Sequence, residues 1–424
     1  MSLLHQLDSS QWQSPEQLAP VLADQLGQVI AHAMATVPFY RERFRGCFDG
    51  AAPDAWLQLP LLQRGDVQEY GQALTSEQPP PSHGGMTETA TSGSTGTPIK
   101  ARGTQVVSLF FQAMKLRTFL WHELDFAAKV GAIRRLSPGQ GMPPDGVREA
   151  GWAPLYRTGP AVGLNIAASV PEQLAWLVQE QPDYLLSYPT NLQALAEYCL
   201  QHGVAVPSIK RVLTMGETVS AATREACAEA WRAPVIDQYS AMEIGIIAVQ
   251  CPQADHYHVM SEDLLVEVLA EDGRQCAPGE VGRVVITTLH NFAMPLIRNA
   301  IGDLAEVGAP CPCGRGLPVL SRVLGRSRNM LVLPSGERRW PSFQPSAILA
   351  PVRQFQVTQK SLGHLAVKLV VARPLQADEE ADLRTALLAD IGCSFDISLH
   401  YVDAIPRSSG GKFEQFICEL DADK

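Results

Sequence analysis

The sequence predicts an α/β protein with a large, multi-layer N-terminal α/β domain that includes a β-rich subdomain, and a small mobile C-terminal α+β domain. Three observations predict this class. The chain has 424 residues, more than one hydrophobic core usually organises, so we expect two or more domains. Helix-like and strand-like segments alternate in the middle of the chain. From about Leu264 onward, short strands dominate.

Composition and charge limit the class of function. Hydrophobic residues make up 46% and charged residues 18%, which is typical of a globular chain and excludes long disorder. The 34 basic and 44 acidic residues give a net charge of -10 without a dense Lys/Arg tract, so we expect no nucleic-acid partner. Asp8, Glu16 and Asp24 interrupt the opening segment, and no apolar run is long enough to span a bilayer. We therefore expect a cytoplasmic protein without membrane contact.

The N-terminal part contains loop, helix and strand signals in that order. The run Pro79-Pro80-Pro81 predicts a loop leading toward Gly84-Gly85. Thr190 is predicted to cap a helix that Gly203 closes, because apolar residues recur at spacings of three and four: Leu192, Leu195, Ala196, Cys199 and Leu200. Short strands are predicted at Arg211–Thr214 and Val235–Ile236.

The β-rich subdomain is expected at about residues 251–325. Strands at Leu264–Leu269 and Arg283–Leu289, joined through the turn Glu271-Asp272-Gly273, indicate antiparallel pairing. The pattern changes again near Gly325–Arg328, so we place the N-terminal domain at 1–326 and the C-terminal domain at 327–424. In the latter, Glu379–Asp390 is helix-like and Ser408–Lys412 is glycine-rich.

The segment Thr91-Ser92-Gly93-Ser94-Thr95-Gly96-Thr97-Pro98-Ile99-Lys100 is the strongest local motif. Its glycines let backbone N–H groups approach an anion, and its hydroxyls add donors, which favours phosphate binding. A flexible Ser/Thr/Gly linker is the alternative that the segment alone leaves open. A P-loop is excluded, because no Gly-Lys-Ser/Thr follows at the required spacing.

Further motifs occur with this segment in a fixed order: Gly216-Glu217, Tyr239-Ser240-Ala241-Met242-Glu243, Ile301-Gly302-Asp303, Gly325-Arg326 and Ser409-Gly410-Gly411-Lys412. Together they resemble the adenylate-forming superfamily of acyl-CoA synthetases, adenylation domains and luciferases. The resemblance runs from about residue 35 to residue 415. The phenylacetate–CoA ligase-like branch is the most similar, on four more segments: Val37–Tyr40, Ser187–Pro189, Ala293–Arg298 and Pro310–Arg315.

The resemblance implies a nucleotide site for ATP. Thr91, Ser92, Gly93, Ser94, Thr95, Gly96, Thr97 and Lys100 would hold the phosphates, and Glu243 would hold Mg²⁺, which prefers oxygen ligands. Asp303 and Arg326 would bind the ribose. The adenine would be lined by Gly216, Glu217, Gln238, Tyr239 and Ser240, with the Tyr239 ring as a stacking face.

The resemblance also implies the catalytic groups, which are Lys412, Glu243 and Thr95. Lys412 would neutralise charge between the attacking carboxylate and the α-phosphate. The acid pocket would contain Tyr188, Met215, Ala241 and Met242, although each of these could equally be a core residue. The expected reaction activates a small, aromatic carboxylic acid as its acyl-adenylate and passes it to coenzyme A.

The cysteines indicate a metal site rather than a disulfide framework, because nine of them are scattered through a long chain. Cys251, Cys311, Cys313 and a histidine form a Cys₃His set that suits a structural Zn²⁺. His258 is the preferred fourth ligand, because it lies closer to the predicted strands, and His256 is the alternative. The spacing Cys311-Pro312-Cys313 is shorter than usual for zinc ligands.

The chain departs from the family pattern at several positions, and these departures indicate alternative functions. Ala300 stands where relatives carry a second arginine, and Arg328-Asn329 replaces paired aspartates at the hinge. The segment Pro334–Pro341 is more similar to a branch associated with capsule and secondary-metabolite pathways. One alternative is therefore a stand-alone adenylating enzyme that loads a carrier protein or couples the acid to an amine. A second is a non-catalytic nucleotide-binding or zinc-stabilised interaction protein. A homodimer is the assembly we consider.

Overall fold

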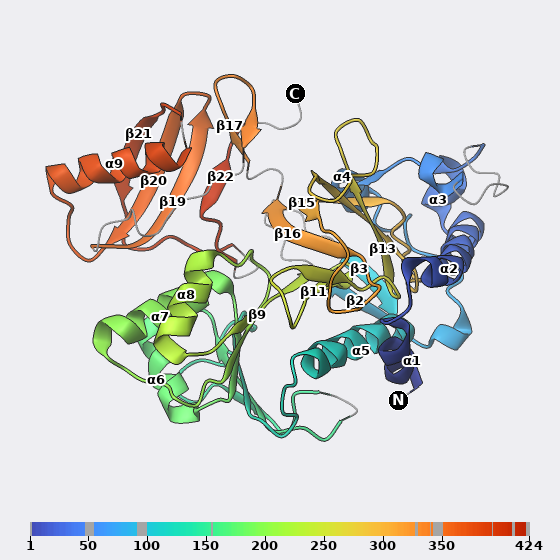
Figure 1. Cartoon of the computed structure of the whole chain (residues 1–424), viewed down its shortest axis with the longest axis horizontal. Coiled ribbons are helices and arrows are strands. Elements are labelled where there is room, and N and C mark those ends of the chain that lie inside the picture. Colours follow the sequence, from blue (N-terminus) through green and yellow to red (C-terminus); the bar gives the residue numbers. More distant parts are fainter. Residues whose placement is uncertain are drawn as a thin grey trace.

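The computed structural model describes residues 2–46, 55–90, 100–153, 156–326, 330–339, 341, 351–391, 393–408 and 412–420 (Figure 1). Among these residues, no helix combines the length and the apolar character that a bilayer crossing requires. The N-terminal part begins with helical segments: α1 (Ser2–Ser10), α2 (Pro15–Thr36), α3 (Pro38–Arg43), η1 (Ala55–Gln58), α4 (Arg64–Glu69) and η2 (Pro81–His83).

A six-stranded sheet forms the middle of the chain, in the order β5-β6-β4-β7-β8-β9. All its neighbours pair in parallel except β5 and β6. The strands are β4 (Val130–Arg134), β5 (Val147–Glu149), β6 (Ala161–Asn165), β7 (Tyr184–Ser187), β8 (Arg211–Thr214) and β9 (Val235–Ile236).

Helices cover both faces of this sheet, because successive strand residues point to opposite sides. Leu185 and Val212 belong to the core shared with α6 (Val170–Glu180), α7 (Pro189–His202) and α8 (Ala221–Trp231). Their neighbours Tyr184 and Leu213 pack instead with Phe119 of α5 (Gln105–Trp121). The predicted strands at β8 and β9 are thus confirmed as buried strands between two helical layers.

The strand order reverses at one end of this sheet. After β4 the chain returns to β6 on one side of β4, and it then crosses to β7 on the other side. In open α/β sheets, ligands bind outside the carboxyl ends of the strands at such a reversal. The carboxyl ends of β4 and β7 bring Arg134 and Arg135 next to Ser187 and Tyr188.

An eight-stranded sheet carries the β-rich part, in the order β10-β11-β12-β16-β15-β14-β13, with β1 added in parallel to β15. The strands are β1 (Leu62–Gln63), β10 (Gln238–Ala241), β11 (Gly245–Gln250), β12 (Tyr257–Val259), β13 (Leu264–Leu269), β14 (Val281–Thr288), β15 (Asn299–Val307) and β16 (Val319–Arg326). The sheet therefore begins before residue 251 and includes a strand from the start of the chain. A separate hairpin of β2 (Met86–Ala90) and β3 (Lys100–Thr104) flanks residues 91–99.

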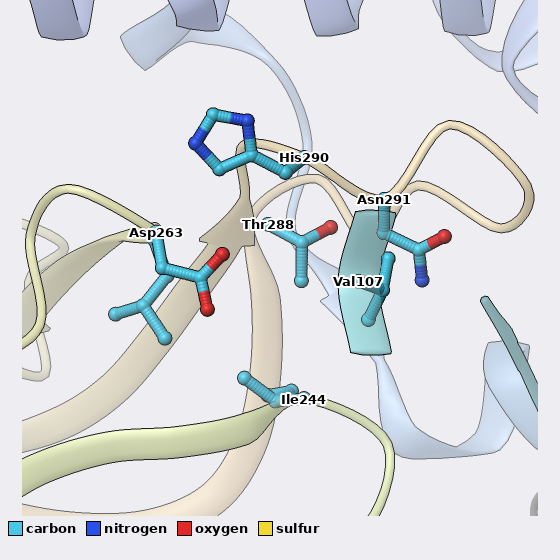
Figure 2. A pocket seen from close by; sticks show the side chains of 7 residues that line it. Val107, Ile244, Asp263, Thr288, His290 and Asn291 are labelled. Carbon is cyan, nitrogen blue, oxygen red and sulfur yellow. The ribbon is translucent and has the colours of Figure 1, made fainter. Parts of the chain in front are cut away.

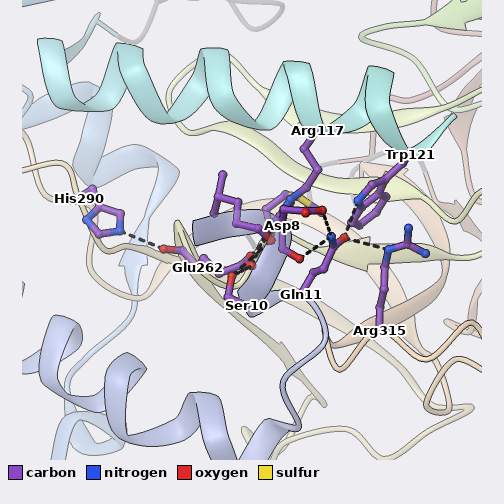
Figure 3. Close-up of polar contacts among 10 residues, drawn as sticks. Asp8, Ser10, Gln11, Arg117, Trp121, Glu262, His290 and Arg315 are labelled. Atoms are coloured by element: carbon purple, nitrogen blue, oxygen red, sulfur yellow. Dashed lines mark hydrogen bonds and ion pairs between the residues drawn. The ribbon is translucent and has the colours of Figure 1, made fainter. Parts of the chain in front are cut away.

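The N-terminal helix α1 is fastened to this core by buried polar contacts (Figure 3). Arg117 of α5 lies 2.8 Å from Glu262, which also accepts a hydrogen bond of 2.7 Å from Ser10. The side-chain oxygen of Gln11 accepts from Trp121 at 2.7 Å and from Arg315 at 3.1 Å. Because these partners come from distant parts of the chain, α1 belongs to the large domain rather than to a separate arm.

The C-terminal part has its own sheet, in the order β21-β20-β19-β22, and its own core. Its elements are β17 (Leu331–Val332), β18 (Arg338–Arg339), β19 (Val352–Ser361), β20 (His364–Val371), α9 (Ala377–Ile391), β21 (Asp396–Tyr401) and β22 (Phe416–Cys418). In Figure 1 this part lies beside the end of the large domain where α8 and β16 are drawn. The predicted α/β class with a small C-terminal α+β unit is confirmed.

One local prediction is wrong. The helix α7 begins at Pro189, and its N-cap is Tyr188 rather than Thr190. Proline suits the first helical position because its φ is already helical and its missing N–H is not needed there. Gly203 does close the helix, in the left-handed conformation with φ of 63°. The hydroxyl of Thr190 is left to donate a hydrogen bond elsewhere, to Glu217 at 2.7 Å.

Candidate active site

Asp303 and Arg326 face each other on neighbouring strands of the large sheet. They are paired in the register of β15 and β16, and Arg326 Nε lies 3.2 Å from Asp303 Oδ1. The hydroxyl of Tyr239 on β10 donates to Asp303 Oδ2 at 2.7 Å. Burial, followed by the charge of Asp303, holds the pKa of Tyr239 well above its usual range. Tyr239 therefore remains a hydrogen-bond donor that fixes the Asp303 carboxylate.

Lys412 of the C-terminal part reaches the same place. A Cβ added to Gly216 would lie 3.1 Å from Lys412 Cε and 3.4 Å from Tyr188 Cε1, so the lysine and the tyrosine close around this glycine. Gly216 has φ of +75°, a conformation that L side chains rarely adopt. Any side chain at this position would displace the lysine and strain the backbone. Glycine here thus permits the close approach.

The charges that act on Lys412 come from the large domain. Burial, and then the positive charge of Arg326, lowers the pKa of Lys412. The negative charges of Asp303, Glu217 and Glu243 oppose that lowering. Glu243 lies in the turn between β10 and β11, and its charge also acts on Tyr239. The structure therefore brings together Lys412, Asp303, Arg326, Tyr239 and Glu243, which the sequence places far apart.

Glu217 has a different setting from the adenine contact that the sequence suggests. Its Oε2 accepts from the Thr190 hydroxyl at 2.7 Å and from the Thr190 N–H at 3.1 Å. Its Oε1 accepts from the Phe413 N–H at 2.6 Å and from Arg407 Nη1 at 3.3 Å. Thr190 and Glu217 belong to the large domain, whereas Arg407 and Phe413 belong to the C-terminal part. The carboxylate therefore lies between the two.

Several predicted site residues lie outside the described residues: Thr91, Ser92, Gly93, Ser94, Thr95, Gly96 and Thr97, together with Ser409–Gly411 and Arg328–Asn329. Lys100, which follows the first of these segments, is exposed at the start of β3 and lies 3.9 Å from Glu88. The hairpin of β2 and β3 nevertheless fixes where the segment leaves and re-enters the fold.

The residues predicted for the acid pocket do not all gather at one point. Tyr188 is buried at the carboxyl end of β7, and its hydroxyl accepts a hydrogen bond of 3.5 Å from the Arg135 N–H. Met215 follows β8, and its N–H donates to Ser187 at 3.2 Å. These two residues lie at the carboxyl ends of the neighbouring strands β7 and β8. Ala241 ends β10, and Met242 in the following turn is 60% exposed.

A small cavity lies near the Glu243 turn and was not indicated by any sequence motif (Figure 2). Its volume is about 10 Å³, roughly that of one water molecule, and its lining includes Ile244, Asp263, Thr288 and His290. Burial, and then the charge of Glu262, raises the pKa of Asp263 to about 7. The cavity is too small for an acid or a nucleotide, so it is separate from the candidate active site.

Four predicted metal ligands meet in the β-rich sheet. The sulfurs of Cys251, Cys311 and Cys313 and a ring nitrogen of His258 all lie within 4.8 Å of one another. Cys251 Sγ and Cys311 Sγ are 3.8 Å apart, and Cys313 Sγ is 3.4 Å from His258 Nε2. A tetrahedron with metal–sulfur bonds of about 2.3 Å has edges of about 3.8 Å, so these residues fit a zinc ion. His258, and not His256, is the histidine in this group.

Comparison with known proteins finds relatives that match nearly the whole chain. A model of the CapK C-terminal domain matches residues 346–419. Phenylacetate-coenzyme A ligase of Thermus thermophilus is 25% identical over 452 residues, covering 95% of this chain and 96% of that protein. The enzyme of the same name from Escherichia coli is 25% identical over 445 residues, with 95% of each chain covered.

Solved structures agree in fold. A 2-hydroxyisobutyryl-CoA ligase in its postadenylation state superposes with a TM-score of 0.75 at 18% identity, covering 97% of this chain and 91% of that one. The same ligase in its thioesterification state gives a TM-score of 0.62 at 19% identity, over 96% and 91% of the two chains. The two parts of this chain are therefore arranged more like the postadenylation state. The chain is therefore similar over nearly its whole length to phenylacetate-coenzyme A ligases, and it shares its fold with acid–CoA ligases that form adenylates.

Proposed function

We propose that this protein uses ATP to activate a small carboxylic acid as its acyl-adenylate and then transfers the acyl group to coenzyme A. The observation that carries this proposal is that Lys412, beside Gly216, feels the charges of Asp303 and Arg326, while Tyr239 and Arg326 hold the Asp303 carboxylate. These groups suit a nucleotide and the charge that develops at its α-phosphate. The phenylacetate-coenzyme A ligases, which match nearly the whole chain, support the same reaction.

In the first step, a carboxylate oxygen attacks the α-phosphorus of ATP, the bond to the bridging oxygen breaks, and pyrophosphate leaves with the electron pair. Lys412 neutralises charge between the carboxylate and the α-phosphate, which stabilises the transition state most in a closed site that excludes water. Positioning is the other main contribution, because the step needs no proton from the protein. Asp303, held by Tyr239 and Arg326, accepts hydrogen bonds from the ribose hydroxyls.

Magnesium and the serine and threonine hydroxyls complete the proposed site. Glu243 offers an oxygen ligand for Mg²⁺, which would bridge and partly neutralise the phosphates. Residues 91–97 would donate hydrogen bonds to the same phosphates, with Thr95 as a catalytic hydroxyl. Gln238, Ser240 and the Tyr239 ring are proposed to line the adenine. Lys100 would lie at the edge of this phosphate site.

We propose that the acid lies at the carboxyl ends of β4 and β7, beside Tyr188 and Met215. The Tyr188 ring would provide an apolar face for an aromatic acid. Arg134 and Arg135 are exposed at the same end of β4, and the charge of Arg134 acts on Tyr188. In the described part of the chain neither guanidinium has an ion-pair partner. An aromatic acid with a second anionic group is therefore a better fit than an uncharged ring.

In the second step, the sulfur of coenzyme A attacks the acyl carbonyl, the bond to the adenylate oxygen breaks, and AMP leaves. The small part of the chain would first rotate, because Lys412 fills the site in the present arrangement. The alternative acceptors are the thiol of a carrier protein and an amine. These acceptors remain alternatives because residues 346–419 match the CapK C-terminal domain.

Zinc is proposed as a structural ion held by Cys251, His258, Cys311 and Cys313. Four protein ligands leave no open position, so the ion would support the fold and would not take part in the reaction. It would tie the end of β11 and strand β12 to the loop between β15 and β16. That loop leads into the strand that ends at Arg326.

The test is ATP–pyrophosphate exchange with a panel of aryl acids, aryl acids carrying a second carboxylate, and amino acids. We expect acid-dependent exchange, followed by AMP release and a thioester when coenzyme A is added. Exchange without thioester formation would point to a carrier protein or an amine as acceptor. Tight ATP binding without exchange for any acid would favour a non-catalytic nucleotide-binding protein.

A further inference from the structure

We propose that Glu217 is a positioning residue that holds the segment carrying Lys412 over the active site during adenylate formation. Its carboxylate acts on the C-terminal part of the chain and not on the adenine. The proposal rests on the proposed function, since it concerns the first half of that reaction. It also gives a role in the reaction to Arg407, which no sequence motif singled out, and to Thr190, which the sequence indicated only as a helix cap.

The contacts of the carboxylate divide between the two parts of the chain. Oε2 is held by the large domain through the N–H and the hydroxyl of Thr190, in the first turn of α7. Oε1 is held by the C-terminal part through the Phe413 N–H at 2.6 Å and Arg407 Nη1 at 3.3 Å. Arg407 also donates to the Thr190 hydroxyl at 3.2 Å. Glu217 thus holds a main-chain group, the Phe413 N–H, that lies 196 residues further along the sequence.

These contacts bracket the catalytic lysine. Phe413 directly follows Lys412, so a hydrogen bond to its N–H fixes the peptide plane between the two residues. On the other side, the Ser408 N–H donates to the Lys412 carbonyl at 2.8 Å, and Arg407 directly precedes Ser408. Both ends of the short segment that contains Lys412 are therefore tied to Glu217. The lysine side chain is aimed at Gly216, the residue next to Glu217.

The environment of Glu217 makes the contact depend on the arrangement of the two parts. Burial raises the pKa of Glu217, while Arg407, the Phe413 N–H and Thr190 act in the opposite direction. A buried carboxylate is costly unless charged or N–H donors satisfy it. If the C-terminal part rotates away, the Oε1 donors leave and water must replace them. Glu217 therefore favours the arrangement in which Lys412 is in place.

The proposal separates the two half-reactions. Adenylate formation needs Lys412 at Gly216, whereas thioester formation follows after the C-terminal part has moved. Weakening the Glu217 contacts should impair the first half-reaction and leave the second one intact or faster. A residue that binds adenine would instead raise the KM for ATP. A residue that only stabilises the fold would lower both half-reactions together.

The experiment compares Glu217→Gln with the parent in two assays. Adenylate formation is followed by pyrophosphate exchange, and thioester formation is followed from supplied acyl-adenylate and coenzyme A. We expect kcat for exchange to fall about 10- to 100-fold, the loss expected for charge-assisted hydrogen bonds, with little change in the KM for ATP. Thioester formation should be unchanged or faster. Arg407→Gln removes the charged partner of Glu217 in the C-terminal part. It should also slow adenylate formation and leave thioester formation unchanged or faster.

A matched control is Glu197→Gln, on the exposed face of α7. It removes the same charge from the same region without touching the C-terminal part, so both half-reactions should keep the parent rates. Thermal unfolding of each variant shows whether the fold is intact. An increase in the KM for ATP at constant kcat, or equal losses in both assays, would overturn the proposal.

A distance measurement tests the same idea without relying on activity. Labels are introduced at Leu200 on α7 and Leu362 in the C-terminal part, which are 42% and 49% exposed, by a chemistry that does not modify cysteine. Pulsed electron spin resonance should show a broader, longer distance distribution in Glu217→Gln than in the parent. An unchanged distribution would contradict the proposal. If no acid supports exchange in the parent, the proposed function fails, while this measurement still decides the role of Glu217.

Discussion

Asp303 and Arg326 stand opposite each other on β15 and β16, 3.2 Å apart, and Tyr239 fixes the second oxygen of the same carboxylate. Arg326 is the last residue of β16, directly before the boundary predicted at residue 327. The proposed ribose contact therefore lies where the large domain ends and the C-terminal part begins. In the proposed mechanism, this position would link nucleotide binding to the movement of the C-terminal part between the two half-reactions.

Removing the lysine should separate binding from catalysis. We expect Lys412→Ala to slow adenylate formation by about 10²- to 10³-fold, because it removes the charge that faces the α-phosphate. ATP binding, measured by calorimetry, should remain nearly intact, because Asp303 and the other nucleotide contacts are retained. Exchange at the parent rate would remove Lys412 from the mechanism.

Replacing the acidic ribose contact should weaken nucleotide binding. We expect Asp303→Asn to raise the KM for ATP about tenfold or more, because hydrogen bonds to a charged acceptor are lost. The matched control is Glu306→Gln, since Glu306 faces Arg322 on the same two strands but on their far portion. The control should have the parent KM, and a similar increase in both variants would argue for a general defect of the sheet.

The basic strand end should affect the choice of acid. We expect Arg134→Gln to raise the KM for acids with a second anionic group about tenfold, and to change the KM of uncharged aryl acids little. Arg211→Gln serves as the control. Arg211 is the first residue of β8, so it lies at the amino ends of the parallel strands, away from Arg134. Equal effects on both classes of acid would contradict the role of Arg134 in acid binding.

Zinc should copurify with the protein at about one ion per chain, the stoichiometry of a single four-ligand site. Cys313→Ser or prolonged chelation should remove the ion and lower the melting temperature, since a structural metal contributes folding free energy. Cys393→Ser, which changes a cysteine of the C-terminal part, should retain both the zinc and the stability. Metal analysis that finds little zinc in fresh protein would reject the site.

The buried carboxyl of Asp263 should make stability depend on pH. Its pKa is raised to about 7 by burial and by Glu262, above the ordinary value for aspartate. The folded state therefore binds a proton more tightly than the unfolded state. The stability that this proton supports is fully present below about pH 4 and is lost as the pH rises to about 7.

Asp263→Asn should flatten this dependence. The free energy of unfolding is measured by urea unfolding for the variant and the parent. We expect the difference between them to shift by about 2 kcal/mol in favour of the variant from pH 4 to pH 8. Asp382→Asn, at an exposed position of α9, should keep the pH dependence of the parent. The same slope in Asp263→Asn and the parent would show that this carboxyl is not responsible.

The sequence was most informative where local patterns decide the structure. Arg211–Thr214 and Val235–Ile236 are strands with the predicted bounds, because short apolar runs between helices are typical of buried parallel strands. The helix predicted at Glu379–Asp390 is present as Ala377–Ile391, and the strand at Arg283–Leu289 as Val281–Thr288. Differences of a few residues at such ends follow from caps and pairing that lie outside the pattern.

The sequence was least informative where distant groups compete for one side chain. Thr190 was expected to cap α7, but Glu217, which lies 27 residues further on, draws its hydroxyl away from the helix end. The setting of Glu217 itself depends on Phe413, and no periodicity or spacing connects residues so far apart. The nucleotide motifs indicated which residues would form the site. The packing of the C-terminal part against the large domain decides which neighbouring groups bind to those residues.

The shortest hydrogen bond to Glu217 comes from a main-chain group, the N–H of Phe413, at 2.6 Å. Any residue except proline supplies this N–H, so the bond does not depend on the side chain at position 413. The buried phenylalanine ring at this position reflects packing, which is a separate constraint. The contact with Glu217 therefore depends on the path of the main chain, which a comparison of residue identities does not record.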